Sequence, residues 1–213
     1  MAISQTAGMG VYSDRVLPRL IDRACGSAQL MRWRARVADG LHGDVVEIGF
    51  GSGLNVPVYP DAVQRVWAVD PSETAQRLAH DRMSASSVII DHIAPRGEAL
   101  PLEDGSCDGA LSTFTLCTVG DPATVLAELH RVLRPGAQLH FLEHGLAPDP
   151  GVQRWQHRIN PLQKRLADGC HLTRDPLAMI TEAGFEIVDQ HARYVPRAPR
   201  PWGWFTGGVA QRR

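Results

Sequence analysis

The feature that most constrains the fold of this chain is the stretch VVEIGFGSGLN, residues 45–55. Residues of strand character precede a run in which every second residue is glycine: Gly49, Gly51 and Gly53. Glycine removes the side chain where a backbone turns tightly or approaches a ligand closely. The stretch therefore predicts a ligand-binding loop at the end of a strand, and the ligand could be a phosphate, a nucleotide or a sulfonium compound.

Apolar runs that fit buried strands recur along the chain. They are Val45–Ile48, Val66–Val69, Val88–Ile93, Gly109–Phe114 and Leu139–Leu142, followed by FEIVDQHARYV (185–195) and WGWFTGGVA (202–210). Helical patterns separate several of these runs, and such alternation gives a parallel sheet covered on both faces. The last two runs have no crossover helix between them, so they are expected to pair antiparallel. The predicted fold class is doubly wound α/β, with a mostly parallel seven-stranded sheet and an antiparallel C-terminal strand.

The helix predicted most clearly lies in GDPATVLAELHRVLRPG, residues 120–136. Asp121 is placed to cap it and Pro122 suits its first turn. The pair Pro135-Gly136 is expected to end it. A single apolar stripe is formed by Val125, Leu126, Leu129, Val132 and Leu133.

Composition narrows the class of protein. With 213 residues and 44% hydrophobic content, the chain suits one domain spanning residues 1–213. A net charge of -1 gives no electrostatic reason to expect nucleic acid as a partner, so a small molecule is expected. The four cysteines form no C-x-x-C pair, the first residues do not read as an export signal, and no apolar run is long enough to span a bilayer. These features predict a cytoplasmic chain without an integral membrane segment; the oligomeric state is not predicted.

Three ligands compete for the glycine loop. A P-loop needs Lys followed by Ser or Thr after its glycines, where this chain has Leu54-Asn55. A dinucleotide loop, G-x-G-x-x-G, needs glycine where Leu54 stands. S-adenosylmethionine fits better, because Glu47 ahead of the glycines suits an ammonium group and would repel a pyrophosphate. Asp70, 21 residues after Gly49, suits ribose hydroxyls in either nucleotide and does not discriminate.

From about Asp44 to Glu143 the chain resembles the class I S-adenosylmethionine-dependent methyltransferases. The motifs that carry the resemblance are E-x-G-x-G-x-G, an acidic residue after the second strand, GEALPLEDGSCDG and ELHRVLRPGAQLHFLEH. The resemblance implies that S-adenosyl-L-methionine is bound and S-adenosyl-L-homocysteine is released. It also implies that residues 1–40 form a helical lid. The cofactor-binding residues it implies are Glu47, Gly49, Phe50, Gly51, Asn55, Asp70, Pro71, Gly97, Glu98, Ala99, Thr113, Thr115 and Leu116.

Beyond the fifth strand the chain resembles the animal thiol S-methyltransferases of the methyltransferase-like family. The matching residues are Glu143, His144, Trp155, Gln156, Asp168, Gly169, Cys170, Thr173 and Arg174. Two departures from that family are expected to matter: the sequence shows no hydrophobic N-terminal anchor of the family's kind, and Phe50 stands where cysteine is usual. The resemblance implies S-methylation of a small thiol, with residues 145–175 as a substrate cap. Alternatives are N- or C-methylation of a lipid-like or aromatic metabolite, and a binding module without catalysis.

The residues expected at the acceptor each have a second, structural interpretation. His144 is the candidate catalytic base, or else it hydrogen-bonds a loop carbonyl. Tyr12, Glu143, Trp155 and Cys170 are the candidate substrate contacts. Trp155 could equally be a core residue, and Asp168-Gly169-Cys170 could be only a turn. The group Arg32, Trp33, Arg34 and Arg36 is expected on a solvated face rather than at the substrate.

The run HFLEH, residues 140–144, matches the zinc signature H-x-x-E-H. That signature works on a helix, where its residues share one face. Here the run reads as a strand, which places His140 and Glu143 on opposite faces of the sheet. Methyl transfer to a thiol needs alignment of the reactants rather than a metal, so no metal ligands are predicted.

Overall fold

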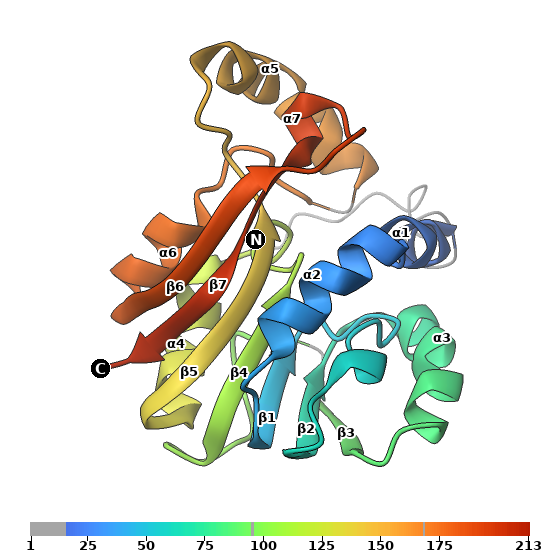
Figure 1. Cartoon of the computed structure of the whole chain (residues 1–213), viewed down its shortest axis with the longest axis vertical. Helices are drawn as coiled ribbons and strands as arrows, with labels where there is room; N and C mark the ends of the chain where they lie inside the picture. The colour runs from blue at the N-terminus through green and yellow to red at the C-terminus, as the bar shows by residue number, and fades with distance from the viewer. Residues whose placement is uncertain (1–15, 95, 168) are drawn as a thin grey trace, which may run out of the picture.

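A computed structural model of the chain describes residues 16–213 apart from positions 95 and 168. Its centre is one seven-stranded sheet in the order β3-β2-β1-β4-β5-β7-β6 (Figure 1). The strands are β1 (Gly43–Ile48), β2 (Val63–Val69), β3 (Ile89–Ala94), β4 (Cys107–Thr113), β5 (Leu133–His144), β6 (Phe185–Tyr194) and β7 (Trp204–Arg212). The seven apolar runs of the sequence therefore correspond to the seven strands.

The first five strands run parallel to one another, and β7 pairs antiparallel with both β5 and β6. The predicted fold class is confirmed. The last strand inserts between β5 and β6 instead of adding to the outer edge. Sequence alternation predicts that β6 and β7 pair, but it does not say which of them lies next to β5.

Helices cover both faces of the sheet, as the alternation of elements requires (Figure 1). They are α1 (Leu17–Cys25), α2 (Ala28–Ala38), α3 (Glu73–Ser84), α4 (Pro122–Val132), α5 (Pro150–Leu166), α6 (Pro176–Glu182) and α7 (Arg200–Gly203), with the 3-10 turn η2 (Val56–Val58). Figure 1 shows α2 across one face, α4 and α6 behind the other, and α5 with α7 beyond one end of the strands.

Two apolar layers pack against the sheet. The stripe of α4 that contains Val125, Leu126 and Leu129 is fully buried against β4 and β5 on one face. On the other face Trp33 and Val37 of α2 join the core beneath them. Because β1, β2, β4 and β5 run parallel, the loops that follow them lie at the same edge of the sheet. This is the carboxyl end of the strands, where open α/β sheets bind ligands.

One local prediction needs correction, and one helix was not predicted. Helix α4 begins at Pro122 and is capped by Asp121 as expected, but it ends at Val132, before Pro135-Gly136. That pair lies inside β5, where the register with β4 shifts between Leu133 and Gln138. The segment beyond β5 contains a 17-residue helix, α5, with Pro161 inside it. Proline disfavours a helix interior, and α5 accommodates it.

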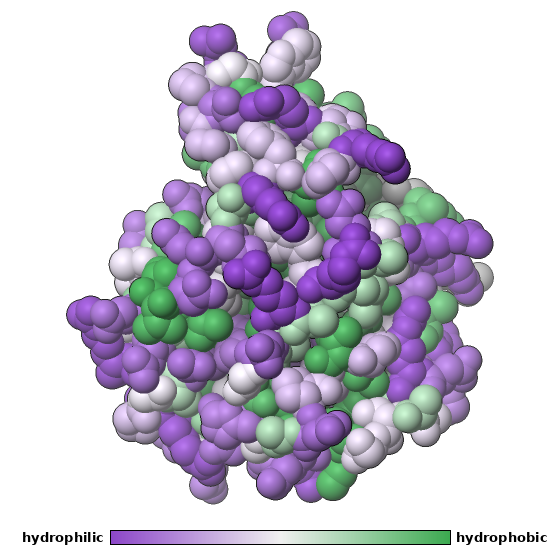
Figure 2. Space-filling model, viewed as in Figure 1, coloured by the Kyte–Doolittle hydropathy of each residue, from purple (hydrophilic) through white to green (hydrophobic). Residues whose placement is uncertain are grey.

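Within the described residues, no helix combines the length and apolar character that crossing a bilayer demands. Hydrophilic side chains cover most of the face that Figure 2 shows, with smaller hydrophobic areas between them. The division into a lid (1–40) and a cap (145–175) stays a prediction.

Candidate active site

The glycine loop turns directly off β1. The backbone N–H groups of Gly49 and Phe50 donate to the carbonyl of Val69, and Gly49, Gly51 and Gly53 all have positive φ. A Cβ on Gly49 would lie 1.9 Å from Oγ1 of Thr115, so protein packing requires glycine there. A Cβ on Gly51 would meet only the carbonyl oxygen of Gly49, at 3.7 Å, among the described atoms. Open space for a ligand therefore lies at Gly51.

Glu47 is fully buried at the end of β1. Its Oε1 accepts a hydrogen bond from Nδ2 of Asn55 at 2.9 Å, and its Oε2 accepts one from the hydroxyl of Tyr59. Burial raises the pKa of Glu47 to about 7, although these hydrogen bonds and the charge of Arg34 oppose the rise. A buried carboxyl group with a pKa near neutrality is ready to ionise when a cation is placed beside it.

Arg34 reaches this group from α2. Its Nη1 donates to Oδ1 of Asn55 at 2.8 Å and to Oγ1 of Thr113 at 2.7 Å, and Nδ2 of Asn55 donates to the same threonine oxygen at 2.9 Å. Arg34 is 5% exposed. The prediction of a solvated face is therefore wrong for Trp33 and Arg34, which are buried, and right for Arg32 and Arg36, which are exposed.

Asp70 stands where β2 ends. Its Oδ2 accepts from the N–H of Gly51 at 2.9 Å and its Oδ1 from the N–H of Ser72 at 2.8 Å. Burial raises its pKa, against the effect of these two hydrogen bonds. The carboxylate is thus held against the glycine loop at the position predicted for the ribose. Pro71 is exposed beside it.

The other predicted cofactor residues differ in access. The ring of Phe50 is buried in the core and meets His92 edge-on at 5.3 Å, so only its backbone is available to a ligand. Gly97 is buried, and a Cβ there would lie 3.2 Å from Val125. Glu98 is half-buried and Ala99 is exposed, so both are open to a ligand.

The loop after β4 is shaped by a buried carboxylate. Oε1 of Glu143 accepts hydrogen bonds from the hydroxyl of Ser112 (2.8 Å) and from the N–H groups of Thr115 (3.0 Å) and Leu116 (3.1 Å). Oε2 has no partner among the described residues, and burial raises the pKa of the group. Phe114 turns the loop with a φ of 57°, a conformation that side chains rarely adopt outside functional turns. Glu143 is predicted to contact substrate. In the structure it lies beneath the loop after β4 and bonds to that loop.

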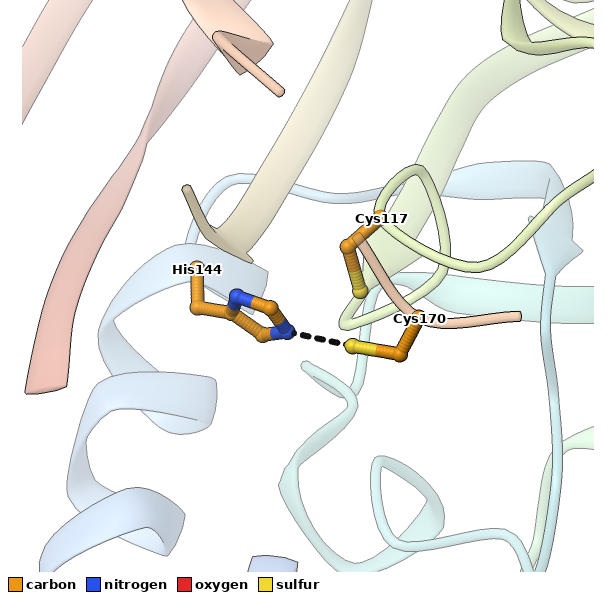
Figure 3. Close-up of side chains that lie close together, drawn as sticks. All are labelled: Cys117, His144 and Cys170. Carbon is orange, nitrogen blue, oxygen red and sulfur yellow. Dashed lines mark hydrogen bonds between the residues drawn. The ribbon is translucent and has the colours of Figure 1, made fainter. Parts of the chain in front are cut away.

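His144 ends β5 beside two cysteines. Its Nε2 lies 3.0 Å from Sγ of Cys170, and Figure 3 shows both of these side chains and Cys117 pointing toward one another. Cys117 follows β4, and Cys170 lies between α5 and α6. The hydrogen bond from Cys117 and burial raise the pKa of Cys170. Burial lowers the pKa of His144, but contact with Cys170 and the charge of Glu143 outweigh it, so the pKa is raised.

The remaining predicted residues are placed as follows. Trp155 is 58% exposed on α5, where the guanidinium of Arg158 lies over its ring at 5.7 Å, so it forms no part of the buried cluster. Its neighbour Gln156 is buried and bonds to the backbone of Gly145 and Ala147, which ties α5 to the end of β5. Tyr12 and Asp168 lie outside the described residues.

The HFLEH run is a strand, as expected. Nδ1 of His140 lies 2.6 Å from the carbonyl of Val37 under α2, whereas Glu143 bonds to the loop after β4. The two side chains therefore do not meet. Three residues that matter here were not predicted: Arg34 as a buried contact, Tyr59 and Cys117. Tyr59 follows the glycine loop in the GLNVPVYP segment, the one signal that could have found it.

Comparisons with known proteins agree with this arrangement. Residues 46–141 match the family model described as a methyltransferase domain. Thiol S-methyltransferase TMT1B of Homo sapiens is 33% identical over 77% of this chain and 66% of its own length. The protein of the same name from Mus musculus is 34% identical over 79% of this chain and 69% of its own. The chain thus spans about two thirds of the length of these relatives.

Solved structures extend the likeness of fold. A SAM-dependent methyltransferase of Thermotoga maritima superposes with a TM-score of 0.64 at 22% identity, covering 92% of this chain and 98% of the other. At that identity the match speaks for the fold alone. The family model and the sequence relatives, together with this fold, show that the chain belongs to the class I S-adenosylmethionine-dependent methyltransferases.

Proposed function

We propose that the chain transfers a methyl group from S-adenosyl-L-methionine to a small thiol. The observation that carries the choice of a thiol is the similarity of more than 30% to proteins named thiol S-methyltransferases. The cluster of one imidazole and two thiols at His144, Cys117 and Cys170, beside the loop after β4, supports a site for a soft sulfur nucleophile.

The residues around the glycine loop fit this cofactor. The open space at Gly51 allows a ligand to approach the backbone, and Asp70 is anchored beside it to accept from ribose hydroxyls. The carboxyl of Glu47 would hold the ammonium of the methionine portion directly or through its partner Asn55. Glu98 and Ala99 are open to the adenine.

Bound S-adenosyl-L-methionine supplies an electrophilic methyl group and leaves as S-adenosyl-L-homocysteine. The chain has to place the acceptor sulfur in line with that methyl group and receive the thiol proton. The loop after β4, held by Glu143, faces this reaction, and we assign His144 the proton. A thiol has an ordinary pKa near 8.5, so an appreciable fraction is thiolate at neutral pH and little help from a base is needed.

The proposed setting is a reducing compartment such as the cytoplasm. All four cysteines, Cys25, Cys107, Cys117 and Cys170, are free thiols. Disulfides are rare where glutathione keeps thiols reduced. The acceptor we propose is a small molecule.

The test is an acceptor panel of matched skeletons. The purified protein is incubated with methyl-labelled S-adenosyl-L-methionine and a thiol, an amine or a phenol that share the same ring. We expect label in the thioether, and loss of that product in Gly51→Ala, whose added Cβ enters the open space. Label in the amine or phenol alone would contradict thiol specificity, and binding without turnover on any acceptor would contradict catalysis.

A further inference from the structure

We propose that Cys117, His144 and Cys170 bind one thiophilic metal ion, Zn²⁺, whose fourth coordination position receives the acceptor thiol. The proposal rests on the thiol methylation proposed above for its substrate and goes beyond it in naming how the acceptor is held. The three ligand atoms come from separate parts of the chain: the loop after β4, the end of β5 and the cap (Figure 3).

The separations of the three ligand atoms are close to those around a tetrahedral metal ion. The two sulfurs and the imidazole nitrogen all lie within 4.8 Å of one another. Tetrahedral zinc, with bonds of about 2.3 Å to sulfur and about 2.0 Å to nitrogen, separates its ligand atoms by roughly 3.5 to 3.8 Å. Nε2 of His144 and Sγ of Cys170, now 3.0 Å apart, would have to separate by only about half an ångström.

Backbone contacts hold the two thiols together independently of the thiols themselves. The N–H of His171 donates to the carbonyl of Cys117 at 2.8 Å, which fixes the segment between α5 and α6 beside the loop after β4. Nη1 of Arg174 donates to the carbonyls of Leu116 (2.6 Å) and Val119 (2.8 Å), on either side of Cys117. The ligands are therefore positioned before an ion arrives, which lowers the cost of binding it.

The kind of ligand selects the kind of ion. Thiolate and imidazole ligands favour zinc and other soft ions over magnesium or calcium, which prefer oxygen. Two thiolates balance the charge of Zn²⁺, and a neutral imidazole adds none. Cys117 and Cys170 are 2% and 7% exposed, so the site excludes most of the water that would compete for the ion.

Three protein ligands leave zinc one position for a substrate, as in catalytic zinc sites. The acceptor thiol loses its proton to solvent as its sulfur bonds to the ion. The bound sulfur then forms a bond to the methyl carbon while the bond from that carbon to the sulfonium sulfur breaks. The products are a thioether and S-adenosyl-L-homocysteine, and the thioether, a weak ligand, leaves. In the ion-bound protein His144 holds the ion, and the ion takes over its task of favouring the thiolate.

Cobalt titration of the full chain tests the site without any methyl transfer. The chain is freed of metal with a chelator under a thiol-free reductant and then titrated with Co²⁺. We expect one equivalent to give the thiolate-to-cobalt absorption and the intense visible bands of a tetrahedral ion, and Zn²⁺ to displace it. Absence of these bands in the folded wild-type chain would overturn the proposal.

Serine substitutions locate the ion. Cys117→Ser and Cys170→Ser are expected to weaken Co²⁺ binding at least about tenfold. Cys107→Ser makes the same change at the first residue of β4, away from the carboxyl end, and should leave the titration unchanged. Undiminished binding in Cys170→Ser would place the ion elsewhere and refute the assignment. Thermal unfolding of each variant shows that it is folded.

Adding a small thiol to the Co²⁺ form, with no methyl donor present, tests the fourth position. The visible bands should shift and the thiolate absorption should grow, whereas a matched phenol should do neither. No change with thiol would overturn acceptor binding at the ion. If the spectra behave as expected but no thiol is methylated, the proposed function fails while the metal site stands.

Discussion

Arg34 of α2 and Asn55 of the glycine loop are joined by a hydrogen bond of 2.8 Å from Nη1 to Oδ1. Through this bond and a second to Thr113, a helix that precedes the first strand is fastened to the loop after β1 and to the last residue of β4. Helix α2, the loop after β1 and the end of β4 therefore share one buried polar network, at the place proposed for the methionine portion of the cofactor.

Replacing Arg34 tests that network. Arg34→Leu removes two hydrogen bonds made by a buried charge, and we expect the free energy of unfolding to fall by about 2 to 3 kcal/mol. Arg36→Leu, an exposed site on the same helix, should change it by less than about 0.5 kcal/mol. Urea unfolding measures both. Equal effects of the two substitutions would show that the network does not stabilise the fold.

Binding of S-adenosyl-L-homocysteine should depend on pH through Glu47. Its pKa is raised to about 7 in the unliganded chain, so at pH 6 most of this carboxyl is protonated. An ammonium beside it favours the carboxylate, so binding releases a proton. Below pH 7, affinity should therefore increase as the pH is raised, by up to about tenfold per pH unit. At still higher pH the ligand amine loses its own charge and affinity falls.

Calorimetry in buffers of different ionisation enthalpy measures that proton release directly. Glu47→Gln cannot ionise and should bind more weakly with no proton release at pH 6.

The buried carboxyl of Glu47 should also make the stability of the unliganded fold depend on pH. A carboxyl with a raised pKa destabilises the fold as it ionises, so unliganded stability should fall by about 3 kcal/mol from this group as pH rises from about 4.5 to about 7. If the free energy of unfolding of the wild-type chain did not change over this pH range, the raised pKa of Glu47 would be contradicted.

The two glycines of the loop should respond differently to alanine. At Gly49 the added Cβ collides with Thr115 and φ is positive, so Gly49→Ala should cost about 3 kcal/mol or more. At Gly51 the backbone is also left-handed but space is open, so Gly51→Ala should cost about 1 to 2 kcal/mol and still fold. Its cofactor binding should be lost. Thermal unfolding with calorimetry separates the effects, and full affinity in Gly51→Ala would refute the ligand position.

Glu143 should matter for the shape of the loop after β4. Glu143→Ala leaves the Ser112 hydroxyl and two backbone N–H groups without an acceptor, at a cost of roughly 3 kcal/mol or more. In Glu143→Gln the amide oxygen can accept the same three bonds, so the cost should be about 1 kcal/mol. Chemical unfolding of both variants checks this. If Glu143→Gln were as unstable as Glu143→Ala, the negative charge of Glu143, and not its acceptor oxygen, would be what stabilises the loop.

The parts that follow from local pattern could be predicted from the sequence. Apolar runs and glycine spacing give the strands and the loop after β1, because burial and positive φ are decided within a few residues. Asp121 caps α4 for the same reason. Pro135-Gly136 misleads because β5 absorbs it in a register shift with β4, which depends on the neighbouring strand.

The parts that depend on distant partners could not be predicted. Arg34 sits in a run of charges typical of a surface, and it is buried only because Asn55 and Thr113, 21 and 79 residues away, accept its hydrogen bonds. Cys117 has no sequence neighbour that suggests a ligand. Its relation to His144 and Cys170 appears only when the loop after β4, the end of β5 and the segment between α5 and α6 are brought together.

The most direct test of thiol methylation offers both nucleophiles in one molecule. 4-Aminothiophenol is incubated with the chain and trideuteromethyl S-adenosyl-L-methionine near neutral pH, and the product is analysed by NMR and mass spectrometry. Because both groups sit on one ring, differences in acceptor affinity cancel. We predict the trideuteromethyl group on sulfur with the amine unchanged. The same label on nitrogen, with the thiol intact, would contradict the proposed function.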